Sequence, residues 1–342
     1  MEFNQKQVKI GKPPHYLCVD SKNNTVFVSC NGSNEIQIIN GDTLELIHSI
    51  YVPQPQHLAV NITTNKLYVI NNQHDKFFKK DEGDVISVID LKSFKIIETL
   101  SNEKGFGNLT INPITNKIIT FSKESEEQLL IFNGDSHKVD SSITLEGSLA
   151  HGTGSVDVNH ETNKIYCLQS EPVIVSDKVV LHVIDEKSKF VTFRPDEKFR
   201  YCGLVDWTKA NSKGDVFFVT GDDTAGLEGG YVLPFREIYK FDGTSNTFTV
   251  KKTDLGQIEH IAYNPNNSKI YVAETNSDSV IIFDENLSEL SKNVLPPLKK
   301  QKTRFRDPAY VRLACNLRTN QVFFTSQDMK NRKEYCLYLF NS

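Results

Sequence analysis

Two histidines, an arginine and a tyrosine stand at one position of a sequence pattern that recurs along the chain. The pattern has seven copies, and the residues at this position, near the start of a short apolar segment, are Tyr16, His57, Asn108, Ser155, Gly203, His260 and Arg312. This set is more polar and more varied than packing requires. Because arginine offers a planar fork of donors and histidine can donate a hydrogen bond or ligate a metal, converging side chains of this kind could bind a carboxylate or a phosphate.

Two acidic residues, Glu274 and Asp222, end the second apolar segment of their copies and could join this set. If either carboxylate reached His260 or His57, the pair could act as general acid and base or hold a divalent metal. The candidate catalytic residues are therefore His57, His260 and Glu274. The candidate ligand-binding residues are Tyr16, His57, Asn108, Ser155, His260, Arg312 and Asp222. The alternative is that these side chains only hydrate a water-filled channel. No cofactor is evident, although a divalent metal is possible.

Each copy of the pattern predicts four strands. An apolar strand, an Asn-rich turn and a second apolar strand with a central aromatic come first, as in HLAVNITTNKLYVI from His57. A third, alternating strand closed by Asn or Asp follows, as in VISVID at 85–90. In six copies a fourth, more polar strand comes next, and polar alternation is typical of an outer edge strand. No segment has a sustained period of 3.6 residues, so we expect little helix.

The seventh copy stops after its third strand, and the missing strand has a counterpart at the other end of the chain. Residues 5–11, QKQVKIG, precede the first copy and have the pattern of the outer strands. The N-terminal strand can therefore complete the last sheet and close a ring. The sequence predicts an all-β protein, a seven-bladed β-propeller of four-stranded antiparallel blades, in a single domain over residues 1–342.

The repeat itself resembles that of a known family. The steps NKLYVIN at 65–71 and SKIYVAE at 268–274, together with VISVID at 85–90, resemble the YVTN-type propeller repeat. The resemblance spans essentially the whole chain and departs most in the fifth copy, at Asp206 and Trp207. It implies the fold more than a function, because proteins of this type include surface-layer proteins, lyase-like and lactonase-like enzymes, and chains with no known activity.

The links between strands differ on the two faces that such a fold would have. Links from first to second strands are short and Asn-rich, and asparagine tolerates the left-handed conformation that tight turns require, so these links look structural. The other face, here called the insertion-rich face, receives long and varied links at 71–84, 169–178, 221–236, 296–309 and 326–333. Variable loops on a rigid scaffold are where binding sites are usually built. The alternative is that these loops bind nothing.

Composition excludes several classes of protein. The 39 basic and 43 acidic residues nearly balance, so nothing favours nucleic acid or an anionic membrane as a partner. No apolar run is long enough to span a bilayer, and no secretory signal is visible. The six scattered cysteines suit buried reduced thiols, so we expect a cytoplasmic monomer, with a removed signal peptide as the alternative. Local motifs for phosphate loops, nucleophile elbows and zinc proteases do not occur.

Two functions are compatible with this pattern. The first is a non-catalytic binding platform that takes a protein partner or a small ligand on the insertion-rich face. The second is a propeller hydrolase or lyase, lactonase-like or lyase-like, with a His and Glu site that uses a metal or works without one. The first rests on the diverse loops and on the missing catalytic motifs, and the second on the polar set of residues and on the resemblance.

Overall fold

Turns rich in asparagine and aspartate divide the chain into short strands. The computed structural model describes residues 6–72, 84–102, 105–122, 128–145, 154–170, 179–185, 190–193, 204–210, 214–221, 237–252, 258–274, 279–294, 312–327 and 334–341. The strands form seven sheets, each of four antiparallel strands. The chain divides into two compact units, unit 1 with residues 1–99 and 259–342 and unit 2 with residues 100–258.

Unit 1 carries four sheets, of which three follow chain order. They are β2(Pro14–Asp20), β3(Thr25–Cys30), β4(Glu35–Asn40) and β5(Leu46–Tyr51); β6(Pro55–Asn61), β7(Lys66–Asn71), β8(Val85–Asp90) and β9(Lys95–Ser101); and β22(Ile258–Asn264), β23(Lys269–Glu274), β24(Ser279–Asp284) and β25(Glu289–Val294). The fourth sheet has the order β1-β28-β27-β26, with β1(Lys6–Ile10), β26(Leu313–Cys315), β27(Gln321–Gln327) and β28(Tyr335–Asn341).

Unit 2 carries three sheets, all in chain order. They are β10(Phe106–Asn112), β11(Lys117–Ser122), β12(Gln128–Asn133) and β13(Val139–Thr144); β14(Gly154–Asn159), β15(Lys164–Ser170), β16(Val179–Ile184) and β17(Phe190–Phe193); and β18(Leu204–Ala210), β19(Val216–Gly221), β20(Glu237–Asp242) and β21(Thr247–Lys252). The departure of the fifth copy from the repeat coincides with a register shift between Asp206 and Lys209 in β18.

The fold class predicted from the sequence is confirmed: the chain is an all-β, seven-bladed β-propeller whose blades are the seven sheets. Among the described residues, the 3-10 turn η1(Asn31–Ser33) is the one helical segment. None of the helical structure described in this chain could cross a membrane. The single domain over residues 1–342 stays a prediction.

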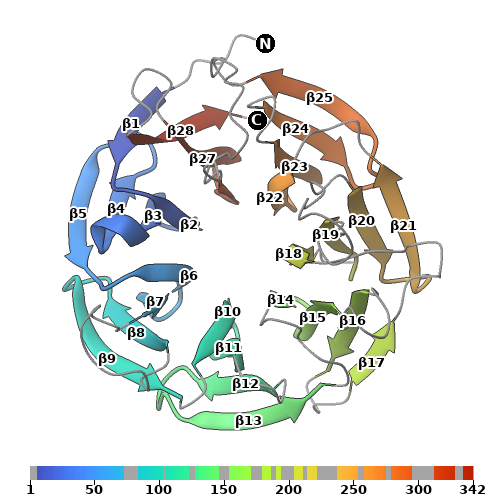
Figure 1. The fold of residues 1–342 in the computed structure, drawn as a ribbon, viewed down its shortest axis with the longest axis horizontal. Helices are drawn as coiled ribbons and strands as arrows, with labels where there is room; N and C mark the ends of the chain where they lie inside the picture. The colour runs from blue at the N-terminus through green and yellow to red at the C-terminus, as the bar shows by residue number, and fades with distance from the viewer. Residues whose placement is uncertain are drawn as a thin grey trace, which may run out of the picture. The chain divides into compact units, whose positions relative to one another are not determined.

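The N-terminal strand completes the last sheet, as the sequence predicts. Strand β1 pairs antiparallel with β28, from Lys6 opposite Leu339 to Ile10 opposite Tyr335 (Figure 1). An ion pair of 2.7 Å between Lys9 Nζ and Glu334 Oε2 accompanies this pairing. The two ends of the chain therefore share one sheet.

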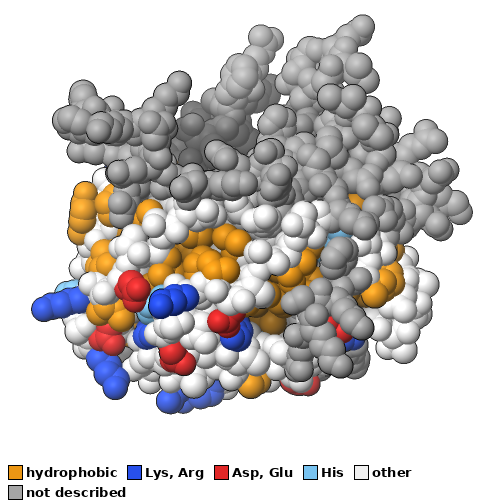
Figure 2. Space-filling model, turned by 90° about the horizontal axis from the view of Figure 1, so that it is seen from below, with side chains coloured by type: hydrophobic (Ala, Val, Ile, Leu, Met, Phe, Trp, Pro, Cys, Tyr) orange, Lys and Arg blue, Asp and Glu red, His pale blue; other side chains and the backbone are white. Residues whose placement is uncertain are grey.

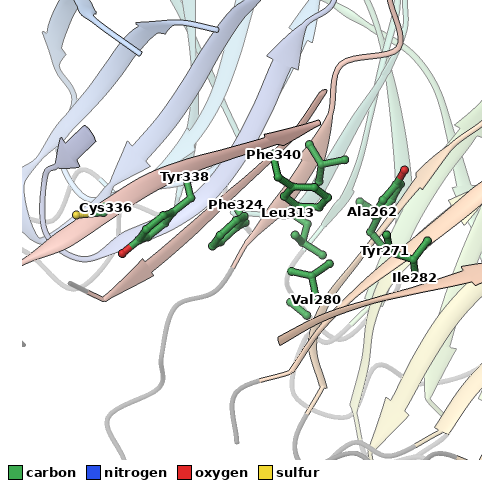
Figure 3. Packing of buried hydrophobic residues seen from close by; sticks show 11 residues of the cluster. Ala262, Tyr271, Val280, Ile282, Leu313, Phe324, Cys336, Tyr338 and Phe340 are labelled. Atoms are coloured by element: carbon green, nitrogen blue, oxygen red, sulfur yellow. The ribbon is translucent and has the colours of Figure 1, made fainter. Parts of the chain in front are cut away.

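Large apolar side chains fill the space between neighbouring sheets. The residues at the centre of the second strands are at most 1% exposed, and they are Phe27, Tyr68, Ile119, Tyr166, Phe217, Tyr271 and Phe323. Figure 3 shows one such layer in unit 1, where the Phe324 and Tyr338 rings stack at 4.9 Å and Phe340 meets Tyr271 edge-on at 6.0 Å. Burial of each large side chain contributes about 1.5 to 3 kcal/mol. This packing holds adjacent sheets together.

The cysteine thiols at two core positions are held protonated. Burial raises the pKa of the Cys30 thiol to about 12, with the Glu35 carboxylate as a smaller cause. Burial also raises the pKa of the Cys167 thiol. Because the thiolate is the reactive form, these two cysteines are packing residues.

Asparagine side chains close the turns after the first strands and tie neighbouring sheets together. Asn316 directly follows β26, the first strand of its sheet, and its Oδ1 accepts hydrogen bonds from the backbone N–H groups of Arg318 and Thr319. Its Nδ2 donates to Asn24 Oδ1 in the next sheet at 2.5 Å. Asn24 has a φ of 49°, the left-handed conformation that asparagine tolerates. The same carboxamide link joins Asn264 to Asn320 and Asn112 to Asn163.

The outer strands expose a mixed surface. Side chains of Ile96, Ile97 and Val139 on β9 and β13 are each more than two-fifths exposed. Figure 2 shows acidic and basic side chains interspersed with separate hydrophobic patches on the described part of that face.

Removal of one carboxamide link tests its contribution to stability. We expect Asn316→Ala to lower the free energy of unfolding by about 1 to 3 kcal/mol, because it leaves buried polar groups without their partner. The exposed Asn286 is the matched control, and Asn286→Ala should change that free energy by less than about 0.5 kcal/mol. Urea unfolding measures both, and equal losses in the two variants would contradict the role of the link.

Acid should remove a stabilising interaction at Asp90. Hydrogen bonds from the Ser93 hydroxyl and from the Ser93 and Lys92 backbone N–H groups hold the pKa of the Asp90 carboxyl below its usual value. A group whose folded pKa is lowered stabilises the fold above its unfolded pKa, and that stability is lost as pH falls through the folded pKa.

We therefore expect the wild type to melt above Asp90→Asn at neutral pH, because the amide accepts these hydrogen bonds less strongly. The difference should shrink when the pH falls below the usual pKa of an aspartate. Thermal melts across this pH range measure it. A difference that does not depend on pH would show that the carboxylate charge is unimportant.

Candidate functional site

Bulges interrupt three of the first strands, β2, β6 and β10, at or beside candidate residues. In β2, Pro14 pairs with Cys30 and Tyr16 pairs with Ser29, so His15 is an extra residue on this strand. In β6 and β10 the same irregularity covers Gln56 with His57 and Gly107 with Asn108. A bulge breaks the strict alternation of side chains and is often found beside functional sites. The bulges therefore affect the direction of the side chains at Tyr16, His57 and Asn108, three of the residues that the sequence singled out.

Four aromatic side chains of unit 1 come together at these positions, and we call them the histidine–tyrosine cluster: His15, Tyr16, His57 and His260. The Tyr16 ring lies 4.7 Å from the His57 ring and 6.1 Å from the His260 ring, measured between centroids. The His15 and His57 rings are 5.8 Å apart and meet edge-on. His260 is buried, and the other three are half-buried. First strands of three sheets thus contribute to one cluster.

A hydrogen bond sets the chemical form of His260. Its Nδ1 accepts a long hydrogen bond of 3.4 Å from the Leu313 backbone N–H. A ring nitrogen that accepts carries no proton, so the neutral ring carries its proton on Nε2. This Nε2 atom is enclosed within the protein. The hydrogen bond from Leu313 therefore fixes the orientation of the His260 ring against β26.

Arg312 adds a permanent positive charge next to β26. Its Nε donates to the His15 carbonyl oxygen at 2.7 Å, which joins the last sheet to the first. Its backbone N–H donates to Thr325 Oγ1 at 3.1 Å, and its carbonyl accepts from the Thr325 N–H at 3.0 Å. Because one guanidinium nitrogen is held by the main chain, the orientation of the charged group is restricted.

Ser29 positions the cluster without belonging to it. Its Oγ accepts a hydrogen bond of 2.8 Å from the Tyr16 backbone N–H and donates one of 2.7 Å to the Gln56 carbonyl oxygen. It therefore connects the bulge of β2 with the bulge of β6. Ser29 is not among the residues that were predicted from the sequence. A signal exists, since Ser29 and Thr325 place hydroxyls where the other copies have apolar residues such as Ile70 and Phe121.

The structure brings together four of the predicted ligand-binding residues. Tyr16, His57 and His260 belong to the cluster. Arg312 donates a hydrogen bond to the main-chain carbonyl oxygen of His15, which is also in the cluster. His15 itself was missed, because nothing local in one sequence marks the extra residue of a bulge.

The other predicted residues are not placed in this cluster. Asn108 and Ser155 belong to unit 2, where Asn108 Oδ1 accepts from the Leu109 N–H at 2.7 Å and Ser155 is buried. Glu274 ends β23 opposite Ser279, but its side chain lies outside what the structure describes, as do Gly203 and Asp222.

The catalytic set of His57, His260 and Glu274 therefore stays a prediction. In the part of the chain that the structure describes, no three His, Cys, Asp or Glu side chains are grouped as metal ligands would be. Most of each long insertion, including 73–83, 171–178, 222–236, 295–311 and 328–333, lies outside the described residues. The role of the insertion-rich face stays a prediction as well.

Similarity to known proteins is found in the fold of this chain and not in its sequence family. No protein-family model matches the chain, and no curated protein does. Among solved structures, hydrazine synthase from Kuenenia stuttgartiensis is similar, with a TM-score of 0.73 over 98% of this chain and 97% of that chain. The two sequences are 13% identical. At this level of identity the likeness concerns the propeller fold alone.

Proposed function

We propose that this chain is a binding module that holds a small ligand bearing a carboxylate or a phosphate at the histidine–tyrosine cluster. One observation carries the proposal: the Tyr16 ring contacts His57 and His260, which come from different sheets of unit 1, and Arg312 donates a hydrogen bond to the main-chain carbonyl of the neighbouring His15. Packing alone does not require this arrangement, because the core of each sheet is already filled by its own apolar residues.

The chemistry of the cluster suits an anion. Arg312 keeps its charge at any physiological pH and matches the planar geometry of a carboxylate or phosphate. His260 gains a positive charge when its ring is protonated, which adds to the attraction for an anion. Hydrogen bonds to charged groups are stronger than neutral ones, and partial burial strengthens them further. Tyr16 supplies a flat wall against which a ligand can pack.

The wider biological setting belongs to the same proposal. We place the chain in the YVTN-type propeller repeat family because its repeat motifs resemble that family throughout. The insertion-rich face would then carry the entrance to the cluster or a docking surface for a protein partner. A cytoplasmic monomer remains the expectation, supported by the protonated core thiols of Cys30 and Cys167.

A hydrolase or lyase reaction at the same cluster is the second candidate. The observation that favours it is the contact of both candidate histidines with one tyrosine ring. Histidine and tyrosine are among the residues that serve as general acids and bases. Such a reaction would need His260 chemically, so His260→Ala would abolish turnover of a lactone or ester substrate without unfolding the protein.

Titration with inorganic phosphate and with succinate tests the binding module. We expect either anion to bind the wild type and to raise its melting temperature. Arg312→Gln should weaken binding about tenfold or more, because it removes a charge-assisted hydrogen bond. Isothermal titration calorimetry measures the affinity, and circular dichroism checks that each variant is folded.

Arg318 is a matched control, because its Nε also donates to a main-chain oxygen of the first sheet, that of Ser21, at 3.0 Å. Arg318→Gln should therefore leave the affinity unchanged. If Arg312→Gln does not fold, His57→Phe replaces it, since this change keeps a ring and removes the nitrogens. Equal losses in the Arg312 and Arg318 variants, or no binding of either anion to the wild type, would overturn the proposal.

A further inference from the structure

A cleft lies in unit 2, among residues that do not belong to the histidine–tyrosine cluster. It has a volume of about 250 Å³ and opens between the β10–β13 sheet and the β14–β17 sheet. Its apolar part consists of Ile119, Ile131 and Ile165. Its polar rim includes Lys117, Asp140 and Asp185. The Asn-rich turns at this end of the sheets have the pattern of structural links, yet two of them contribute Thr115 and Asn163 to the lining.

A bulge in the outer strand β13 places the carboxylate of Asp140 in the lining of this cleft. In β13, Ser141 pairs with Ile131 and Val139 pairs with Phe132, so Asp140 is an extra residue. Strict alternation would place Asp140 and Ser141 on opposite faces, but both line the cleft. The bulge therefore adds a carboxylate that a regular strand would turn away.

Other copies of the repeat show that this carboxylate is not required by the backbone. The same bulge occurs in β5, where the extra residue is Ile47, and in β25, where it is Leu290. These two side chains are 46% and 52% exposed. An exposed apolar residue is thus compatible with the bulge, and the aspartate at position 140 needs another explanation.

The charges around the cleft favour a cation. Lys117 Nζ forms an ion pair with Asp140 Oδ2, and about a third of each side chain is exposed. Among the described residues of the lining there are two carboxylates and one ammonium group, so these residues carry one negative charge in excess. An apolar floor with an acidic rim is complementary to an aliphatic stem that ends in a cationic group. Arginine and lysine side chains have this construction.

Size and position indicate how the cation is presented. The cleft is smaller than the range of about 300 to 1,000 Å³ that is usual for drug-sized ligands, so it fits a single side chain. It borders β13, the last strand of its sheet, which among the described strands pairs only with β12. Edge strands of this kind accept extended peptide segments through their backbone groups.

We propose that this cleft receives an arginine or lysine side chain of a partner polypeptide. The aliphatic stem rests on the partly buried Ile131, next to the buried Ile119 and Ile165, and the cationic head lies beside Asp140 and Asp185. The backbone of the partner lies along β13. This site is independent of the histidine–tyrosine cluster and requires no ligand there.

Paired peptides and paired charge variants test the proposal. The probe is a fluorescently labelled, blocked Val-Arg-Val peptide, and its counterpart carries citrulline, which has the shape of arginine without the charge. We expect the arginine peptide to bind the wild type and the citrulline peptide to bind at least about fivefold more weakly. Asp140→Asn should weaken binding of the arginine peptide by about threefold to fivefold, whereas Lys117→Gln should strengthen it by removing a like charge.

Matched controls on the same turn separate the cleft from the overall charge. Asp135 and Lys138 are exposed and lie outside the lining, so Asp135→Asn and Lys138→Gln should leave the affinity unchanged. Ser141→Phe fills the cleft and should abolish binding. Circular dichroism checks that each variant is folded. If Asp140→Asn is unfolded, the affinities of Lys117→Gln and Ser141→Phe for the arginine peptide test the proposal in its place.

Several results would overturn the proposal. Equal binding of the arginine and citrulline peptides would exclude a cation site. Stronger peptide binding by Asp140→Asn together with weaker binding by Lys117→Gln would indicate an anion site instead. Unchanged binding by Ser141→Phe would place the peptide elsewhere. If ethylguanidinium displaced the labelled peptide at the same concentration as an unlabelled copy of the peptide does, the backbone along β13 would contribute nothing, and a polypeptide partner would be excluded.

Discussion

The carboxamide that ends a first strand is the interaction on which the arrangement of the sheets depends. In Asn316 one oxygen accepts two backbone N–H groups of the turn, while the amide nitrogen donates to Asn24 of the next sheet. One side chain therefore closes a turn and fixes the neighbour. Because buried polar groups are costly when they lack partners, the register between adjacent sheets is set at this end. The apolar layers, such as that of Phe324, Tyr338 and Phe340, then pack in a defined alignment.

The turns at one end of the sheets are regular, whereas the first strands carry bulges at the other end. The first strands start with bulges at His15 and at Gln56 with His57, and Ser29 bridges the two with hydrogen bonds to both strands. Bulges and bridging hydroxyls cost packing, because they replace regular pairing and apolar contacts. They persist where the surrounding structure holds them, and this is characteristic of positions that serve a purpose other than stability.

Comparison between copies of the repeat separates structural residues from residues of interest. Aspartates and asparagines that close the turns recur in most copies and accept the same backbone N–H groups, as Asp90 and Asn133 do. Asp140 has no such counterpart, since Ile47 and Leu290 occupy its position elsewhere. Arg312 is likewise distinct in the set that includes Tyr16. A charged residue that occurs in only one copy therefore indicates a binding role better than a polar residue that recurs in most copies.

The sequence by itself determined the strands, the turns and the sharing of the last sheet by β1, because alternation of side chains and the left-handed conformation of residues such as Asn65 are local properties. It also identified Tyr16, His57, His260 and Arg312 as equivalent positions. Only the tertiary structure decided that Tyr16 contacts His57 and His260, that His15 joins them, and that Asp140 enters a cleft. The physical reason is that a bulge depends on how two strands pair. The contact between Arg312 and His15, moreover, joins residues at opposite ends of the chain.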